Sequence, residues 1–309
     1  MKNPSSQNGK EFARVYDRKQ KCWLSFSEPV HIVEIYKTAN LLPALEKIEN
    51  ACRTDKLFAV GFVAYDAAPA FDAAMQCRRA PDFPLLWFGL FPPPRKAKTL
   101  PLSIAAQTPP SFDYNWSPTV SENEYNAAIK RVKDYIEHGQ TYQVNYSFRL
   151  RTRIDEQPEA LFDRIISSQG FGYGAFLQTR QWTVCSASPE LFFAKDDAHL
   201  KMRPMKGTAS RGLTREDDLR NADWLRNSEK NRAENLMIVD MVRHDLGHIA
   251  DPGSVKVDKI FEVEQYPTVW QMTSTVECRT TAGFADIFRA LFPAASITGA
   301  PKIRTMEII

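Results

Sequence analysis

A glutamate and a lysine lie at the same open end of a β-hairpin that the sequence predicts over residues 190–205. Apolar and polar residues alternate in its arms, and a central Asp-Asp-Ala-His supplies the turn. If Asp196 pairs with His199, Glu190 lies opposite the residue before Lys206. A change of one residue in the length of the loop would put Lys206 directly across from Glu190. Either register predicts a carboxylate beside an amine.

Such a pair can do covalent chemistry if the lysine loses its proton. A neutral Lys206 amine is a nucleophile, and Glu190 beside it is a candidate general acid or base. Burial or a second cation would favour the neutral amine, and Arg203 and Arg211 are available as that cation. The alternative is an exposed ion pair, which typically contributes only about 0–1 kcal/mol. The hairpin alone leaves both interpretations open.

Carboxylates also occur in an apolar helix predicted over 229–246. Apolar residues lie on nearly every face, which predicts that most of this helix is buried, yet Glu234, Asp240 and Asp245 lie in or beside the apolar run. Buried carboxylates are costly unless they are paired, protonated or bound to metal. Arg243 favours an ion pair for Asp240. Glu234 stays open between a structural role and a metal or catalytic role.

A third stretch, ASITGAPK at 295–302, predicts a turn of small residues before a helix that begins near Pro301. Backbone N–H groups at such a helix start can bind a carboxylate or phosphate. An ordinary capped turn has the same composition, so this alternative stays open. The five histidines are dispersed, and their spacing predicts neither a metal site nor a catalytic triad.

Composition excludes several classes of protein. The 309 residues carry a net charge of only +3, which gives no reason to expect a nucleic-acid or membrane partner. Five scattered cysteines without a C-x-x-C spacing predict reduced thiols rather than disulfides or zinc. Neither an apolar signal region nor a run of roughly 18 apolar residues is present. We therefore predict a cytoplasmic location.

The elements that must position these residues alternate without a repeat or a strict βαβ order, which predicts an α+β fold. Residues 1–20 are polar and predict a frayed start, and the proline-rich 92–118 predicts a crossing connection. Helices are predicted over 41–51, 122–138, 159–168, 215–226, 229–246 and 284–291. Strands are predicted within 23–35 and over 57–65, 85–91, 141–153, 182–186, 255–261 and 269–278.

The helix at 122–138 has the clearest pattern. Ser121 and Glu124 predict a capping box at its start. Its apolar stripe predicts a face buried in the core, formed by Tyr125, Ile129, Val132 and Ile136.

Taken together, four motifs resemble the chorismate-utilising enzymes. They are SPE at 188–190, RPMKGT at 203–208, AENLMIVDMVRHDLG at 233–247 and TGAPK at 298–302. The resemblance covers about residues 118–309 and implies a layered, anthranilate synthase-like sandwich of β-sheets with flanking helices. We predict a catalytic domain over 118–309 and an N-terminal subdomain over 1–117. The lysine of P-x-K-G-T resembles the aminodeoxychorismate synthase component I branch, because anthranilate and isochorismate synthases usually carry a small residue there.

The resemblance also implies roles for individual residues. Lys206 would attack ring carbon 2 of chorismate as the 4-hydroxyl leaves, and ammonia from a glutamine amidotransferase partner would then enter at carbon 4 and expel the lysine. Glu190 would be the general acid and base, and Glu234 would hold Mg²⁺ on the substrate carboxylate. Substrate contacts would come from Gly207, Thr208, Ser296, Gly299 and Ala300.

Two departures from the family pattern bear on this hypothesis. Gln271 stands where many relatives have a histidine base, which favours amination without aromatisation. The family also continues with a segment that carries a second metal carboxylate and a substrate-binding arginine and tyrosine, so the chain is predicted to be truncated at its C-terminus, with an exposed sheet edge. A non-catalytic remnant or binding subunit and anthranilate synthase component I remain alternatives.

Overall fold

The computed structural model describes residues 12–78, 82–99, 114–170 and 172–309. Its contacts divide the chain into two compact, interleaved units. Unit 1 consists of residues 1–67, 79–110 and 156–189, and unit 2 of residues 68–78, 111–155 and 190–309. The predicted functional division at residue 117 stays a prediction. Of the proline-rich connection predicted over 92–118, residues 100–113 lie outside the described residues.

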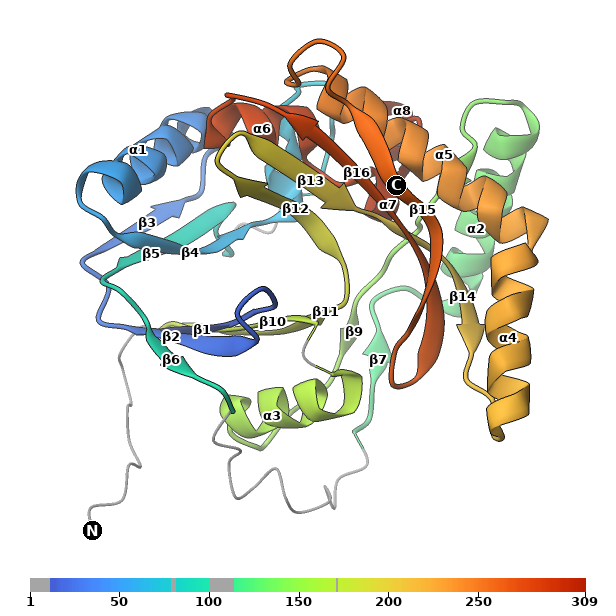
Figure 1. Cartoon of the computed structure of the whole chain (residues 1–309), viewed down its shortest axis with the longest axis horizontal. Helices are drawn as coiled ribbons and strands as arrows, with labels where there is room; N and C mark the ends of the chain where they lie inside the picture. The colour runs from blue at the N-terminus through green and yellow to red at the C-terminus, as the bar shows by residue number, and fades with distance from the viewer. Residues whose placement is uncertain (1–11, 79–81, 100–113, 171) are drawn as a thin grey trace. The chain divides into compact units, whose positions relative to one another are not determined.

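Unit 1 contains two antiparallel sheets and two α-helices (Figure 1). One sheet has the strand order β11-β10-β1-β2-β6 and the other the order β3-β5-β4. The strands are β1 Phe12–Asp17, β2 Cys22–Ser27, β3 His31–Ile35, β4 Phe58–Val63, β5 Leu86–Phe91, β6 Arg95–Ala97, β10 Tyr173–Gln178 and β11 Thr183–Ser188. The helices are α1 Leu41–Thr54 and α3 Pro158–Gln169, and short 3₁₀ turns cover Thr38–Asn40 and Tyr65–Ala70.

The start of the chain is more ordered than its polarity predicts. Residues 12–17 form β1, which lies between β2 and β10, so the prediction of a frayed segment over 1–20 is wrong for these residues. Successive side chains of β1 point to opposite faces of the sheet, and the fully buried Ala13 points to the core. Large aromatic side chains fasten α3 to this sheet, where Trp23, Phe162 and Phe176 pack together.

Unit 2 is built on the sheet β12-β13-β16-β14, with β15 also paired to β16. Its strands are β7 Ser117–Pro118, β8 Gln143–Val144, β9 Leu150–Arg151, β12 Leu191–Asp196, β13 His199–Arg203, β14 Met205–Ser210, β15 Lys256–Gln265, β16 Val269–Arg279 and β17 Gly299–Ala300. Its helices are α2 Glu122–Glu137, α4 Arg215–Asn227, α5 Glu229–Gly247, α6 Phe284–Leu291, α7 Ala295–Thr298 and α8 Lys302–Ile308. The α+β class is confirmed.

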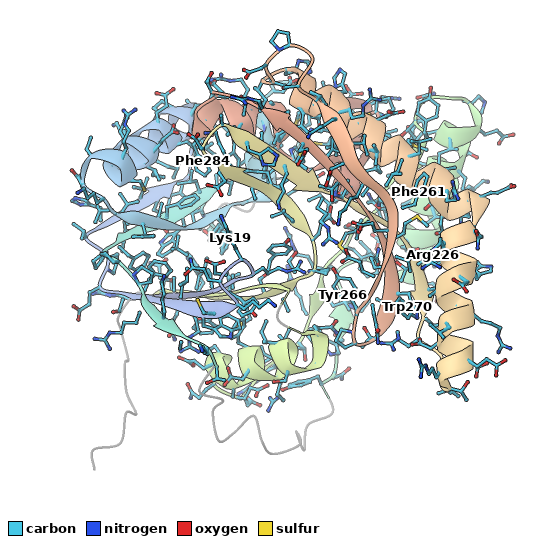
Figure 2. The ribbon with its side chains drawn as sticks, in the orientation of Figure 1. Lys19, Arg226, Phe261, Tyr266, Trp270 and Phe284 are labelled. Atoms are coloured by element: carbon cyan, nitrogen blue, oxygen red, sulfur yellow. The ribbon has the colours of Figure 1, made fainter. Side chains whose placement is uncertain are left out.

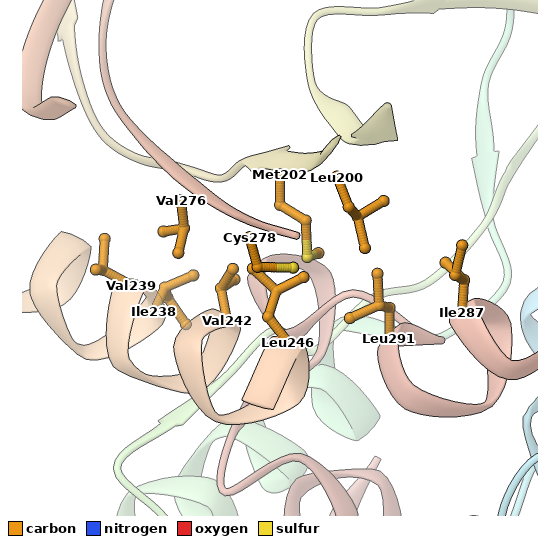
Figure 3. Packing of buried hydrophobic residues seen from close by; sticks show 10 residues of the cluster. All are labelled: Leu200, Met202, Ile238, Val239, Val242, Leu246, Val276, Cys278, Ile287 and Leu291. Atoms are coloured by element: carbon orange, nitrogen blue, oxygen red, sulfur yellow. The ribbon is translucent and has the colours of Figure 1, made fainter. Parts of the chain in front are cut away.

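Helices α5 and α6 pack on one face of this sheet, and together with β13 and β16 they form the main core of unit 2 (Figure 3). The cluster consists of Leu200, Met202, Ile238, Val239, Val242, Leu246, Val276, Cys278, Ile287 and Leu291. Fully burying a side chain of this size typically contributes about 1.5–3 kcal/mol, so the cluster holds α5 firmly against β13 and β16. The orientation of α5 in turn decides where Glu234 and Asn235 lie.

The central hairpin has the predicted turn, but its register changes before the open end. Asp196 pairs with His199 as expected, but an irregularity then shifts the register so that Leu191 lies opposite Arg203. The hairpin ladder ends at Pro204, as predicted, while β14 continues along β16 in the register that β13 began. The prediction that Glu190 lies opposite Met205 in a regular ladder was wrong, because the irregularity shifts the register and β12 begins only at Leu191.

Three other predictions failed for related reasons. Residues 141–153 form only the short pairs made by β8 and β9, because β8 pairs with β17 and β9 with β7. The capping box of α2 is confirmed, but its apolar stripe is not buried, and Tyr125 and Ile136 are exposed. Helix α5 buries one side only, and Leu236 on the other side is 45% exposed.

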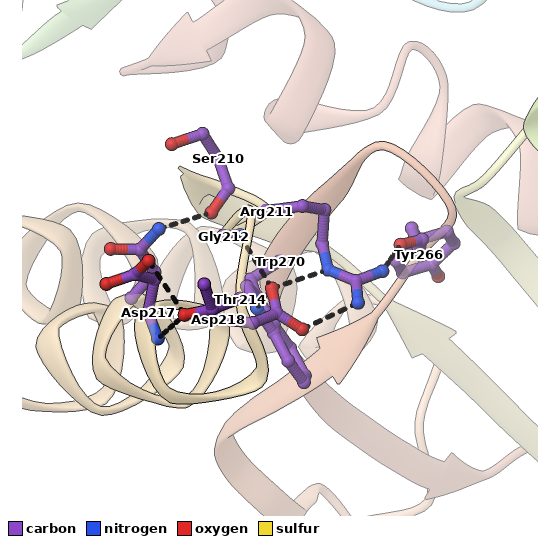
Figure 4. A network of polar contacts seen from close by, with 9 residues as sticks. Ser210, Arg211, Gly212, Thr214, Asp217, Asp218, Tyr266 and Trp270 are labelled. Atoms are coloured by element: carbon purple, nitrogen blue, oxygen red, sulfur yellow. Dashed lines mark hydrogen bonds and ion pairs between the residues drawn. The ribbon is translucent and has the colours of Figure 1, made fainter.

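A polar network closes the end of β14 against α4 and the β15–β16 hairpin (Figure 4). The guanidinium of Arg211 donates two hydrogen bonds to Asp218, at 2.7 and 2.6 Å, and one to the Tyr266 carbonyl. The Trp270 indole and the Gly212 amide also donate to Asp218. The side chains of Trp270 and Tyr266 extend from the hairpin end nearest this network (Figure 2). These bonds hold the pKa of Asp218 well below its usual range.

Candidate active site

Lys206 lies on β14 as a half-buried side chain held by two asparagines. Its Nζ donates a hydrogen bond to Asn145 Oδ1 at 3.1 Å. Its backbone carbonyl accepts from Asn235 Nδ2 on α5 at 3.2 Å. Asn235 is buried and also accepts a 2.5 Å bond from the Ser274 hydroxyl on β16. The amine is therefore anchored through both its side chain and its main chain, as a reacting group requires.

Glu190 lies just before β12 and faces the same site. Its Oε1 accepts a 2.5 Å hydrogen bond from the Ser296 hydroxyl, and the Met205 backbone N–H also bonds to the carboxylate. Asn145 connects the two groups, because it accepts from Lys206 Nζ and its Nδ2 donates to the Ser296 carbonyl at 3.0 Å. Segments far apart in sequence thus meet around one acid and one amine.

Burial moves both ionisable groups toward their neutral forms. It lowers the pKa of Lys206, and the negative charges of Glu190 and Glu234 only partly oppose this. Burial also raises the pKa of Glu190, against the Ser296 hydrogen bond, the charge of Lys206 and the Met205 N–H. A free amine beside a protonated carboxyl group is the arrangement needed for a nucleophile and a general acid.

The two arginines do not supply a second cation for Lys206. Arg203 pairs with Glu264 on β15, and Arg211 is held by Asp218. Neither contributes to the lowered pKa of Lys206, which arises from burial. Burial, rather than a neighbouring cation, therefore accounts for the lowered pKa of Lys206.

Next to Lys206, the backbone of Gly207 has φ +99°, which side chains rarely permit. A Cβ there would lie 3.1 Å from Asn231 Cβ and 3.2 Å from Met272 Cβ. The Thr208 hydroxyl donates to Gln271 Oε1 at 2.9 Å, so these two polar side chains form a pair across β14 and β16. Their predicted contacts with substrate stay predictions.

The backbone of the small-residue turn at 295–302 is partly engaged in strand pairing. Gly299 and Ala300 form β17, which pairs with Val144 and Gln143 of β8. A Cβ on Gly299 would lie 2.0 Å from the Gln143 carbonyl oxygen, which explains the glycine structurally. Pro301 is the N-cap of α8 rather than its first helical residue. The predicted substrate contacts of Gly299, Ala300 and the buried Ser296 remain predictions.

Glu234 projects from the first half of α5 with a side chain 35% exposed. Among the described residues its ion pair is a long one, 3.9 Å to Lys230. No group of three histidine, cysteine or acidic side chains that could hold a metal occurs in the described part of the chain. A partly exposed carboxylate of this kind could supply one oxygen ligand to Mg²⁺, with waters and substrate groups as the others.

The two carboxylates in the second half of α5 have structural partners. Asp240 pairs with Arg243 at 2.9 Å on the exposed side, as predicted. Asp245 is buried and lies 2.6 Å from the buried Lys302 Nζ, which also donates to the Leu291 carbonyl. This ion pair ties the end of α5 to the start of α8, just beyond the turn that carries Ser296.

Sequence analysis missed the roles of Asn145 and Asn235. The only sign of Asn145 was a group of amide side chains at the start of the strand predicted over 141–153. An asparagine on the buried side of an apolar helix, directly after Glu234, was the sign of Asn235, because a buried amide needs hydrogen-bond partners.

The fold is that of a family of enzymes that bind chorismate. The chorismate binding enzyme family matches residues 6–309, and the chain belongs to it.

Several curated proteins are similar to this chain in sequence. The chain is 39% identical over 205 residues to aminodeoxychorismate synthase component 1 of Salmonella typhimurium, covering 66% of this chain and 45% of that protein. It is 36% identical over 212 residues to the Bacillus subtilis protein of the same name, covering 68% and 45%. Anthranilate synthase component 1 of Aquifex aeolicus is 35% identical over 197 residues, covering 63% and 40%. The chain thus spans about half the length of the curated relatives it matches.

Solved structures confirm the fold. Anthranilate synthase component I from Streptococcus pneumoniae superposes with a TM-score of 0.76 at 20% identity, covering 100% of this chain and 79% of that one. The menaquinone-specific isochorismate synthase from Escherichia coli gives 0.75 at 14% identity, covering 98% and 73%. None of the helices in the described ranges is long and apolar enough to cross a membrane.

Proposed function

We propose that this chain carries the aminating site of an aminodeoxychorismate synthase component 1, which converts chorismate and ammonia to 4-amino-4-deoxychorismate on the route to para-aminobenzoate and folate. The single observation that carries the proposal is the half-buried Lys206 amine, with a lowered pKa, beside the Glu190 carboxyl group, with a raised pKa. Relatives named aminodeoxychorismate synthase component 1 support the same assignment.

In the proposed reaction the neutral Lys206 nitrogen forms a bond to ring carbon 2, both ring double bonds shift by one position, and the 4-hydroxyl leaves from carbon 4. Glu190 donates the proton that makes the leaving group water. The secondary ammonium that results loses a proton, ammonia forms a bond to carbon 4, and the lysine leaves carbon 2 as Glu190 and solvent restore the proton balance. The net exchange is one ammonia taken up and one water released.

The hydrogen bonds around the site keep the two groups in place for these steps. Ser296 orients the Glu190 carboxyl group, and Asn235 holds the main chain of Lys206. We propose Glu234 as one ligand of a Mg²⁺ ion, which would neutralise charge on the substrate carboxylate when bound. Gly207, Thr208, Gly299 and Ala300 are proposed to line the substrate.

The name component 1 in the relatives implies a second component. We propose that ammonia comes from a glutamine amidotransferase subunit and that the reaction takes place in the cytoplasm. The 35% identical anthranilate synthase component 1 makes that activity the second candidate. Lys206 favours amination without aromatisation, because an amine nucleophile on the enzyme has no role in a direct addition of ammonia.

The deciding experiment compares the protein with Lys206→Ala and Lys201→Ala, supplied with chorismate, ammonium and Mg²⁺. Lys201 is an exposed lysine of neighbouring β13 and serves as the matched control. We expect Lys206→Ala to lose at least about 100-fold in aminodeoxychorismate formation, as for loss of a covalent catalyst, while Lys201→Ala retains activity. Full activity of Lys206→Ala would refute the covalent role, and anthranilate as the product would favour the second candidate.

A further inference from the structure

We propose that Asn145 is the positioning residue for the nucleophile, and that its neutral carboxamide fixes the direction of the Lys206 amine without adding charge. The hydrogen bond of 3.1 Å between Lys206 Nζ and Asn145 Oδ1 is the observation behind the proposal. The inference rests on the proposed nucleophilic role of Lys206 and adds a residue that the family motifs quoted above do not contain.

The orientation of the Asn145 amide is decided by its second partner. Its Nδ2 donates to the carbonyl of Ser296 at 3.0 Å, and a carbonyl can only accept. The oxygen must therefore face Lys206, where it can only accept a hydrogen. Both ends of the amide are satisfied, so turning it over would break two hydrogen bonds at once.

This geometry decides where the lone pair of the neutral amine can point. A neutral amine has two N–H groups and one lone pair, and one N–H is committed to Asn145 Oδ1. The lone pair must then point away from Asn145, which restricts the rotation of the amine about its last carbon–nitrogen bond. Holding a nucleophile in its reactive orientation is worth far more than a typical contact, because orientation is part of the activation barrier.

Charge explains why an amide rather than a carboxylate suits this position. The charged groups that act on the amine are Glu190, before β12, and Glu234 on α5, and both favour the ammonium form. Burial outweighs them and lowers the pKa of Lys206. A third carboxylate at 3.1 Å would favour the ammonium form further, whereas the Asn145 carboxamide leaves the balance unchanged.

The test compares Asn145→Asp and Asn145→Leu, both close in size to asparagine, with the matched control Asn126→Asp. Asn126 lies exposed on α2 of the same unit. Cyanate adds only to a neutral amine and forms carbamoyl-lysine without a leaving group, so its rate at Lys206 reports the free amine. The rate is measured by peptide mass spectrometry from pH 6 to 10, on the full chain in chelator without magnesium. Circular dichroism checks each fold.

We expect Asn145→Asp to shift the Lys206 labelling profile upward by about 1–3 pH units, a 10- to 1,000-fold lower rate at a fixed lower pH. Asn126→Asp should leave the profile in place. In turnover, Asn145→Leu should lower kcat for amination at least 10-fold with KM within about twofold, because orientation is lost rather than substrate contact.

An unchanged labelling profile in Asn145→Asp, in a folded protein, would overturn the proposal, and so would full kcat in Asn145→Leu. The labelling does not depend on chorismate. If Asn145→Asp shifts the profile while the unaltered protein makes no aminodeoxychorismate, the proposed function fails and the contact between Asn145 and the Lys206 amine stands.

Discussion

The buried ion pair between Asp245 and Lys302 gives the sharpest stability prediction. The two side chains are each 7% exposed, their charged atoms are 2.6 Å apart, and they join α5 to α8. Another ionisable group beside the pair is His244, whose Nδ1 lies 3.5 Å from Asp245 Oδ1. Removing one partner of this ion pair leaves the other charge buried without its close counter-charge, which typically costs about 3–5 kcal/mol. Replacing both by apolar residues of similar size removes the desolvation cost along with the attraction, and is often neutral.

We therefore expect Asp245→Leu and Lys302→Met each to lower the free energy of unfolding by about 3–5 kcal/mol. The double variant should lose less than either alone. Lys302→Met also removes a hydrogen bond to the Leu291 carbonyl, worth about 1 kcal/mol in both the single and the double variant. The coupling free energy from the double-mutant cycle should then be at least about 3 kcal/mol.

The assay is urea unfolding followed by tryptophan fluorescence, with the slope compared among variants. The matched control is the pair Asp240–Arg243 on the same helix, whose side chains are 60% and 53% exposed. Asp240→Leu should change the free energy by less than about 1 kcal/mol. The reasoning is refuted if Asp245→Leu costs no more than Asp240→Leu, or if the two single costs simply add in the double variant.

Three further predictions concern the site and the polar network. Gly207→Ala should destabilise the protein by about 1–3 kcal/mol, measured by the same urea transition, because its φ of +99° disfavours a side chain; equal stability would show that the backbone there relaxes freely. Glu234→Gln should weaken the magnesium dependence of amination at least 10-fold in a Mg²⁺ titration, and an unchanged titration would mean that the metal lies elsewhere. Because the pKa of Asp218 is depressed in the folded state, its stabilising effect is present above the ordinary carboxyl pKa and is lost as the pH falls through the folded-state value. Melting temperatures measured from pH 7 down to pH 3 should therefore fall less steeply for Asp218→Asn than for the unaltered protein, and parallel curves would contradict this.

Local pattern was enough to predict most helices and to single out Lys206 and Glu190 as neighbouring ionisable groups. Ser121 and Glu124 predicted the start of α2, because a capping box is formed by residues within one four-residue segment. Lys206 and Glu190 were found because their residue types and neighbouring motifs are visible in the sequence alone. The turn of the central hairpin followed for the same reason, since Asp196 and His199 are only three residues apart.

The features that the sequence did not predict depend on contacts between segments far apart in the chain. The exposed stripe of α2 and the half-exposed α5 show that periodicity finds an apolar face but not what covers it. The bulge near Leu191 shifts the hairpin register, and β14 continues the pairing of β13 with the distant strand β16 past Pro204. The hydrogen bonds of Lys206 to Asn145 and of Glu190 to Ser296 span 61 and 106 residues. Only the packed tertiary structure brings such groups within hydrogen-bond distance of one another, at 3.1 and 2.5 Å, and the same packing supplies the burial that shifts the pKa values of Lys206 and Glu190.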